Sequence, residues 1–105
     1  MPRFSPMTSD ESRFAEALYR AYEAERPPGR EYAPLHLVRR HVAREFTPPL
    51  STVLCFLQRV YPKLLAEDSP YSISLEVDWR GSKPANPPVI DGVPRYIIAM
   101  RPRRS

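Results

Sequence analysis

Residues 71–79, YSISLEVDW, decide the fold of this chain, because here the spacing of apolar residues changes from helical to alternating. In an extended strand, successive side chains point to opposite faces. This alternation therefore predicts a half-buried strand with a polar outer face. The residues expected on its apolar face are Tyr71, Ile73, Leu75, Val77 and Trp79.

A second strand is predicted at residues 95–101, RYIIAMR, with Tyr96, Ile98 and Met100 on one face. With nothing else to pair with, the two strands are expected to pair with each other in the antiparallel sense. Residues 80–94 then join the arms of the hairpin. Loops longer than about 12 residues are usually functional or disordered, so this loop is a candidate contact surface.

Upstream of the strands, apolar residues at helical spacing predict three helices. Thr8 and Glu11 match a capping box at the start of the first helix, residues 9–26, and Pro27 ends it. In the second helix, Pro34 suits the first turn, and Thr47 marks the end.

The third helix, about residues 49–66, carries a wide apolar stripe and is therefore expected to lie at the centre of the core. Pro62 falls inside this helix. Because proline lacks an N–H and clashes with the preceding turn, we expect a kink or a break near Tyr61.

Composition favours one domain over residues 1–105, with flexible ends at 1–8 and 102–105. Hydrophobic residues make up 42% of the chain and charged residues 27%, an ordinary globular balance. No apolar run approaches the roughly 18 residues of a membrane span, and residues 1–11 do not resemble a secretory signal. The single cysteine, Cys55, excludes an internal disulfide and fits the cytoplasm.

The net charge of +4 is unevenly distributed. Residues 35–66 hold five basic and one acidic residue, and residues 80–105 hold six and one. Residues 67–79 hold four acids and no base. If the fold brings the two basic segments onto one face, that face would attract a polyanion. Solvation of an ordinary surface is the alternative explanation.

Three helices followed by a strand, a long basic loop and a strand resemble the winged-helix (winged helix-turn-helix) superfamily in element order. The resemblance spans residues 9–101, and its best local match is FTPPLSTVLCFLQRVYPKLLAEDSPYSISLEVDWRG, residues 46–81. It implies an α+β fold of three helices with a C-terminal antiparallel β-hairpin, the wing. It also implies double-stranded DNA binding and transcriptional regulation.

In this superfamily the third helix commonly enters the major groove, and the wing contacts phosphates or the minor groove. Carried over, the resemblance assigns the third helix Ser51, Thr52, Cys55, Gln58, Arg59 and Lys63, with Gln58 and Arg59 suited to base edges. It assigns the wing Arg80, Lys83 and Arg95. Arg39, Arg40 and Arg44 of the second helix would contact phosphates.

A protein-interaction module is the main alternative to DNA binding. The wing loop is apolar and rich in proline, so ordering it on a partner costs little entropy. The anchors for such a partner would be Pro87, Pro88, Val89 and Ile90. Separately, Phe14, Tyr19 and Tyr22 offer more aromatic surface than one small core absorbs, which predicts a homodimer through the first helix.

Catalysis and cofactor binding are not expected. The three glycines are scattered at positions 29, 81 and 92, so no glycine-rich phosphate loop exists. His36 and His41 lie five residues apart and thus on different faces of a helix, which argues against a shared metal. Cys55 lies in an apolar helix without a histidine nearby in sequence. Trp79 and Tyr96 could stack on bases, but packing under the hairpin is the favoured role.

Overall fold

The computed structural model describes residues 7–46, 50–79, 84 and 87–103. Helix α1 (Ser9–Glu25) begins at the expected capping box. The backbone N–H of Thr8 donates to Oε1 of Glu11 over 3.0 Å, and the N–H of Glu11 donates to Oγ1 of Thr8 over 3.1 Å. These two bonds satisfy donors that the first helical turn leaves unpaired.

The second and third helices are α2 (Leu35–Glu45) and α3 (Leu50–Leu64). The buried side of α3 carries Val53, Leu57 and Val60, and this stripe confirms that α3 is central to the core. Of the kink or break expected near Tyr61, a break is absent, because α3 continues through Pro62 to Leu64. Pro62 lies exposed in the last turn, where its missing N–H removes only one helical bond.

The expected antiparallel pair is confirmed as β2 (Tyr71–Glu76) and β5 (Ile97–Pro102), in the register Tyr71↔Pro102 to Glu76↔Ile97. The first strand is shorter than the 71–79 that its alternation suggested. After Glu76 the chain leaves the sheet, and Val77 is 46% exposed instead of facing the helices. The apolar and polar residues still alternate after Glu76, but no strand pairs with this segment, so the alternation does not define two faces of a sheet.

A third strand, β1 (Ala33–Pro34), was not expected from the sequence. It pairs antiparallel with β5 in the register Ala33↔Ile98 and Pro34↔Ile97. The strand order of the sheet is therefore β1-β5-β2. Two residues carry too little pattern to predict a strand, and only pairing with β5 defines this one.

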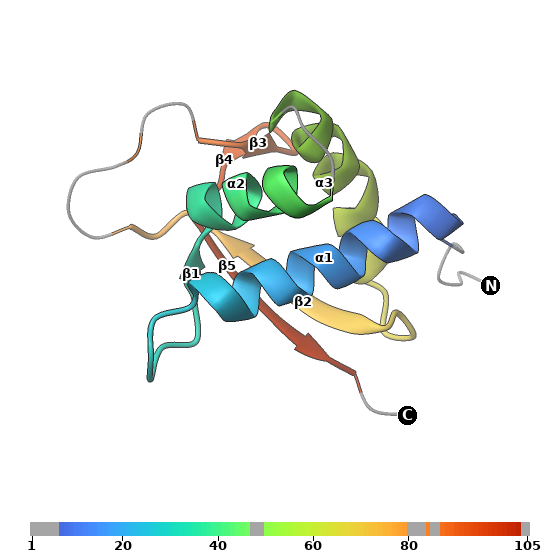
Figure 1. Ribbon diagram of the computed structural model, residues 1–105, viewed down its shortest axis with the longest axis horizontal. Coiled ribbons are helices and arrows are strands. Elements are labelled where there is room, and N and C mark those ends of the chain that lie inside the picture. The colour runs from blue at the N-terminus through green and yellow to red at the C-terminus, as the bar shows by residue number, and fades with distance from the viewer. Residues whose placement is uncertain (1–6, 47–49, 80–83, 85–86, 104–105) are drawn as a thin grey trace.

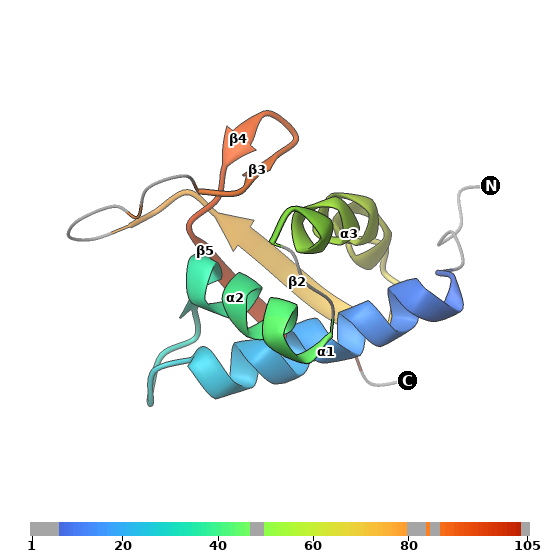
Figure 2. The same cartoon turned by 45° about the horizontal axis from the view of Figure 1, so that its top comes forward.

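Inside the long connection between β2 and β5, strands β3 (Val89–Ile90) and β4 (Val93–Pro94) form a small hairpin of their own. Asp91 and Gly92 both have positive φ, 55° and 74°. Paired positive φ values are typical of the tight two-residue turns that suit twisted hairpins. Figure 2 shows this hairpin above α3, away from α1.

All three helices cover one face of the β1-β5-β2 sheet (Figure 1). Leu75 of β2 and Ile98 and Met100 of β5 point into the core, as the alternation predicts. Ile90 of the small hairpin is also buried in this core, at 1% exposure. The described part of the chain is thus a two-layer α+β domain with the hairpin docked against it.

Candidate nucleic-acid interface

The arginines of α2 divide into one that supports the fold and two that face solvent. Arg39 is half-buried and donates from Nε and Nη2 to the carbonyl of Leu50, over 3.2 and 3.0 Å. Burial lowers the pKa of Arg39 below its usual value, because desolvation disfavours the charged form. The bond holds the start of α3 against the middle of α2. Arg40 and Arg44 lie one turn apart and exposed.

Within the described residues, Arg40 and Arg44 have no carboxylate partner. Five other cations among the described residues do have a carboxylate partner. The pairs are Arg13–Asp10, Arg26–Glu23, Arg59–Glu11, Lys63–Glu11 and Arg101–Glu31. Two exposed guanidinium groups without an acid between them suit phosphate oxygens, which arginine binds in a bidentate manner.

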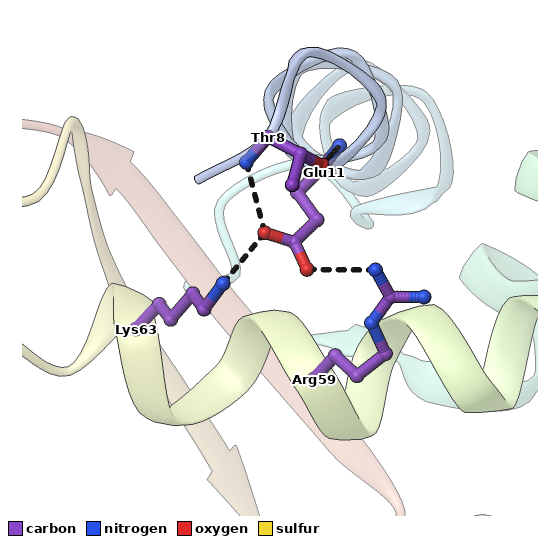
Figure 3. Close-up of polar contacts among 4 residues, drawn as sticks. All are labelled: Thr8, Glu11, Arg59 and Lys63. Carbon is purple, nitrogen blue, oxygen red and sulfur yellow. Dashed lines mark hydrogen bonds and ion pairs between the residues drawn. The ribbon is translucent and has the colours of Figure 1, made fainter. Parts of the chain in front are cut away.

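Arg59 and Lys63 of α3 converge on one carboxylate of α1 (Figure 3). Lys63 Nζ lies 2.7 Å from Oε1 of Glu11, and Arg59 Nη2 lies 2.9 Å from Oε2. The side chain of Glu11 is only 3% exposed. The ammonium of Lys63, the backbone N–H of Thr8 and the guanidinium of Arg59 together lower the pKa of Glu11 from 4.5 to about 2. They outweigh burial, which raises it.

This ion cluster changes the roles expected for α3. Both cations bind the protein itself, so neither projects freely toward a ligand. Arg59 keeps 56% of its side chain exposed, and its guanidinium lies 5.1 Å from the ring centroid of Phe56. A phosphate or base could reach this guanidinium only by sharing it with Glu11.

Gln58 is also engaged. Its Nε2 donates to the carbonyl of Val89 in β3 over 3.0 Å and so ties α3 to the small hairpin. Of the remaining α3 residues expected to contact DNA, Ser51 and Cys55 are exposed and Thr52 is half-buried. Leu50, at the start of the helix, is 40% exposed.

Arg95, expected on the wing, supports the sheet edge instead. Its Nη1 donates to the carbonyl of Leu75 over 2.8 Å, and its guanidinium lies 5.8 Å from the ring centroid of Tyr61. At the other end of β2, Arg103 donates from Nε to the carbonyl of Tyr71 over 3.2 Å. Occupying carbonyls of an edge strand discourages pairing with another chain. The wing candidates Arg80 and Lys83 lie outside the described residues.

The two histidines serve separate contacts. His41 Nδ1 lies 3.0 Å from Oε2 of Glu25 in α1, and its Nε2 lies 3.1 Å from Oε1 of Glu45. His36 meets Trp79 edge-on, with ring centroids 5.9 Å apart. Burial first, and then the charge of Arg40, lower the pKa of His36. No group of three potential metal ligands converges in the part of the chain that the structure describes.

The aromatic side chains behind the expected dimer are used within the chain. Phe14 is fully buried and stacks on Phe56, with ring centroids 5.2 Å apart. Tyr22 is buried as well, and Tyr19 stacks on Tyr71 at 5.3 Å. Dimerisation through α1 stays a prediction that light scattering can test, but these rings no longer provide its driving force.

The four loop residues expected to anchor a protein partner are only partly available at the surface. Pro88 and Ile90 are buried, whereas Pro87 is half-buried and Val89 is 45% exposed. Sequence reasoning missed this docking, although Asp91-Gly92 between β-branched residues is a recognisable turn signal. It also missed the role of Glu11 beyond its capping box, for which the sequence offers no local signal.

No protein-family model matches the chain, and neither the curated proteins nor the solved structures include a match to it. Among the described helices, none combines the length and the apolar character needed to cross a bilayer.

Proposed function

We propose that this chain is a winged-helix protein that binds double-stranded DNA, in the manner of a transcriptional regulator. Its element order and the β1-β5-β2 sheet support the winged-helix part of the proposal, because they are compatible with that topology. In this assignment, β2 and β5 flank the wing and the β3–β4 hairpin belongs to it.

The observation that carries DNA binding is the pair of exposed arginines on α2 that lack an acidic partner among the described residues. Arg40 and Arg44 are exposed on α2, the helix whose Arg39 holds the start of α3 through the carbonyl of Leu50. Phosphate contacts of this kind orient a protein on the duplex and carry no sequence information. They make affinity depend steeply on salt, because condensed counterions are released.

Sequence discrimination is expected to be weak. Gln58 and Arg59, the side chains of α3 best equipped for base edges, bind Val89 and Glu11 instead. Ser51, Thr52 and Cys55 remain for base contacts, and short side chains make few bidentate contacts. Affinity should therefore come mainly from the backbone of the duplex.

The experiment is a fluorescence-anisotropy titration of a labelled random duplex at several salt concentrations. The wild-type protein should bind more weakly as salt rises. The double variant Arg40→Ala/Arg44→Ala should bind every duplex less tightly and reduce the magnitude of the salt slope by about 2, roughly one unit for each lost phosphate contact. Both side chains are exposed, so the folded state should persist by circular dichroism.

A control with the same change of net charge is Arg20→Ala/Arg101→Ala. The exposed side chain of Arg101 in β5 pairs with Glu31, and Arg20 lies near Tyr71. This control should leave the salt slope nearly unchanged. Equal losses in both double variants would indicate nonspecific attraction by net charge, and absence of duplex binding by the wild-type protein would refute the proposed function.

A further inference from the structure

The face of the β1-β5-β2 sheet opposite the helices is open in the described part of the chain. Ala33 and Ile98 point into the core, so their neighbours Pro34 and Ile97 point outward. A hollow of about 690 Å³ lies at this end of the open face. We call it the outer-sheet groove; its main lining residues are Pro27, Tyr32, Pro34, Asp78, Trp79 and Ile97.

The wall of the groove that follows α1 is held by hydrogen bonds to the end of α1 and within the segment itself. The hydroxyl of Tyr22 donates to the carbonyl of Glu31, and Arg26 Nη1 donates to the carbonyl of Arg30 over 2.7 Å. The backbone N–H of Arg30 donates to the carbonyl of Pro27 over 3.1 Å. A wall fixed in this way needs little further ordering when a ligand binds, which favours affinity.

The opposite wall is aromatic. Trp79 packs against His36 and against Tyr96, with ring centroids 5.9 and 6.2 Å apart, and stays half-buried. Tyr32, in the segment that follows α1, adds a second half-buried aromatic ring to the groove. Proline-rich segments in the polyproline II conformation dock on aromatic-lined grooves of this kind, because the ligand is already extended and its rings pack flat on aromatic faces.

The charges around the groove favour a basic ligand. Asp78 is exposed and has no cationic partner among the described residues. The carboxylate of Glu76 accepts from the hydroxyl of Ser74 and, within the same described residues, pairs with no cation. Glu31 pairs with Arg101, but both side chains are more than half exposed, so a ligand cation can replace that exposed contact. Arg30 can donate to ligand carbonyls. Electrostatic complementarity of this sign steers basic partners and repels polyanions.

We propose that the outer-sheet groove captures an extended, proline-rich segment of another protein that carries arginine or lysine beside its prolines. This interaction is independent of the proposed DNA contacts, which lie on α2 and α3. It also differs from an interaction through the loop apolars, since Pro88 and Ile90 are buried.

The test uses a synthetic peptide of repeated Arg-Pro-Pro triplets, titrated into the full chain. Trp79 is the only tryptophan, so its fluorescence reports on the groove directly. We expect saturable binding with a change in this fluorescence. The same peptide with glutamate in place of arginine, or with glycine in place of proline, should bind at least about tenfold more weakly, a loss of roughly 1.4 kcal/mol.

Variants locate the site. Tyr32→Ala and Asp78→Lys should each weaken the Arg-Pro-Pro peptide about tenfold or more, while duplex DNA binding is not reduced. The matched control is Asp68→Lys, which reverses a charge in the same acidic segment but outside the groove. Circular dichroism checks that each variant is folded.

Several results would overturn the proposal. They are no fluorescence change at millimolar peptide, equal binding of the glutamate peptide, or an equal loss in Asp68→Lys. Self-association of the chain that Tyr32→Ala abolishes, without peptide binding, would instead identify a second copy as the occupant. Binding of single-stranded nucleic acid that Tyr32→Ala weakens, again without peptide binding, would likewise reject a protein ligand.

Discussion

Replacing Arg59 and Lys63 together by methionine is expected to lower the free energy of unfolding at neutral pH by about 3 kcal/mol. The reason is the carboxylate of Glu11, which is 3% exposed and would keep only the backbone N–H of Thr8 as a partner. A buried charge without a counter-charge is costly, whereas methionine retains most of the packing of both side chains. Urea unfolding followed by Trp79 fluorescence measures the loss.

The pH dependence of stability in this variant should have the same sign as in the wild-type protein but be smaller. In the wild type, the pKa of Glu11 is lowered from 4.5 to about 2 on folding. Its contribution is therefore fully present above pH 4.5 and lost as the pH falls toward 2. In the variant the two cations are absent, but the backbone N–H of Thr8 remains and lowers the pKa of Glu11 more than burial raises it. Acidification should therefore cost the variant less stability than it costs the wild type.

The control for this prediction is Arg101→Met, which removes a pair with Glu31 at 3.2 Å whose side chains are 70% and 59% exposed. Exposed pairs contribute about 0–1 kcal/mol, so this change in the free energy of unfolding should be small. If Arg59→Met/Lys63→Met behaved like Arg101→Met, Glu11 would not be a buried, charge-stabilised carboxylate.

Replacing Ile90 by alanine is expected to destabilise the fold by about 2–4 kcal/mol, although Ile90 lies in a segment with the composition of a surface loop. Its side chain is 1% exposed and belongs to the main core. Removing it leaves a cavity where the β3–β4 hairpin docks, in addition to the lost transfer free energy. Thermal and urea unfolding measure the effect.

The matched control is the neighbouring residue. Val89 is 45% exposed on the other face of the same strand, and Val89→Ala should change stability by no more than about 0.5 kcal/mol. Equal effects at positions 89 and 90 would show that the hairpin is not docked through Ile90. A partner-binding assay should accordingly use changes at Val89, since a change at Ile90 also tests folding.

Local patterns in the sequence determined most of the secondary structure. The capping box of Thr8 and Glu11 and the following Pro27 set the limits of α1 to within a residue, because caps act over a single turn. The alternation from Tyr71 onward gave the identity and the inward face of β2, but it overstated its length, since a strand ends where its partner ends.

The small strands β1, β3 and β4 could not be predicted from composition alone. For β3 and β4, the Asp91-Gly92 turn is a local signal that could have been used. For β1, two residues carry no period at all, and only the register with β5 makes Ala33 and Pro34 a strand. Burial of Ile90 is likewise a property of docking, which no local pattern encodes.

In the candidate interface, too, some features follow from the sequence and others only from the tertiary structure. The sequence by itself determined which residues carry positive charge, and of the three arginines it assigned to the second helix, Arg40 and Arg44 are exposed. Only the tertiary structure decided which cations are engaged: Glu11 lies 48 residues from Arg59 and 52 from Lys63, yet binds both. Ion pairing depends on distances of a few ångströms and on burial, and packing of α1 against α3 sets both.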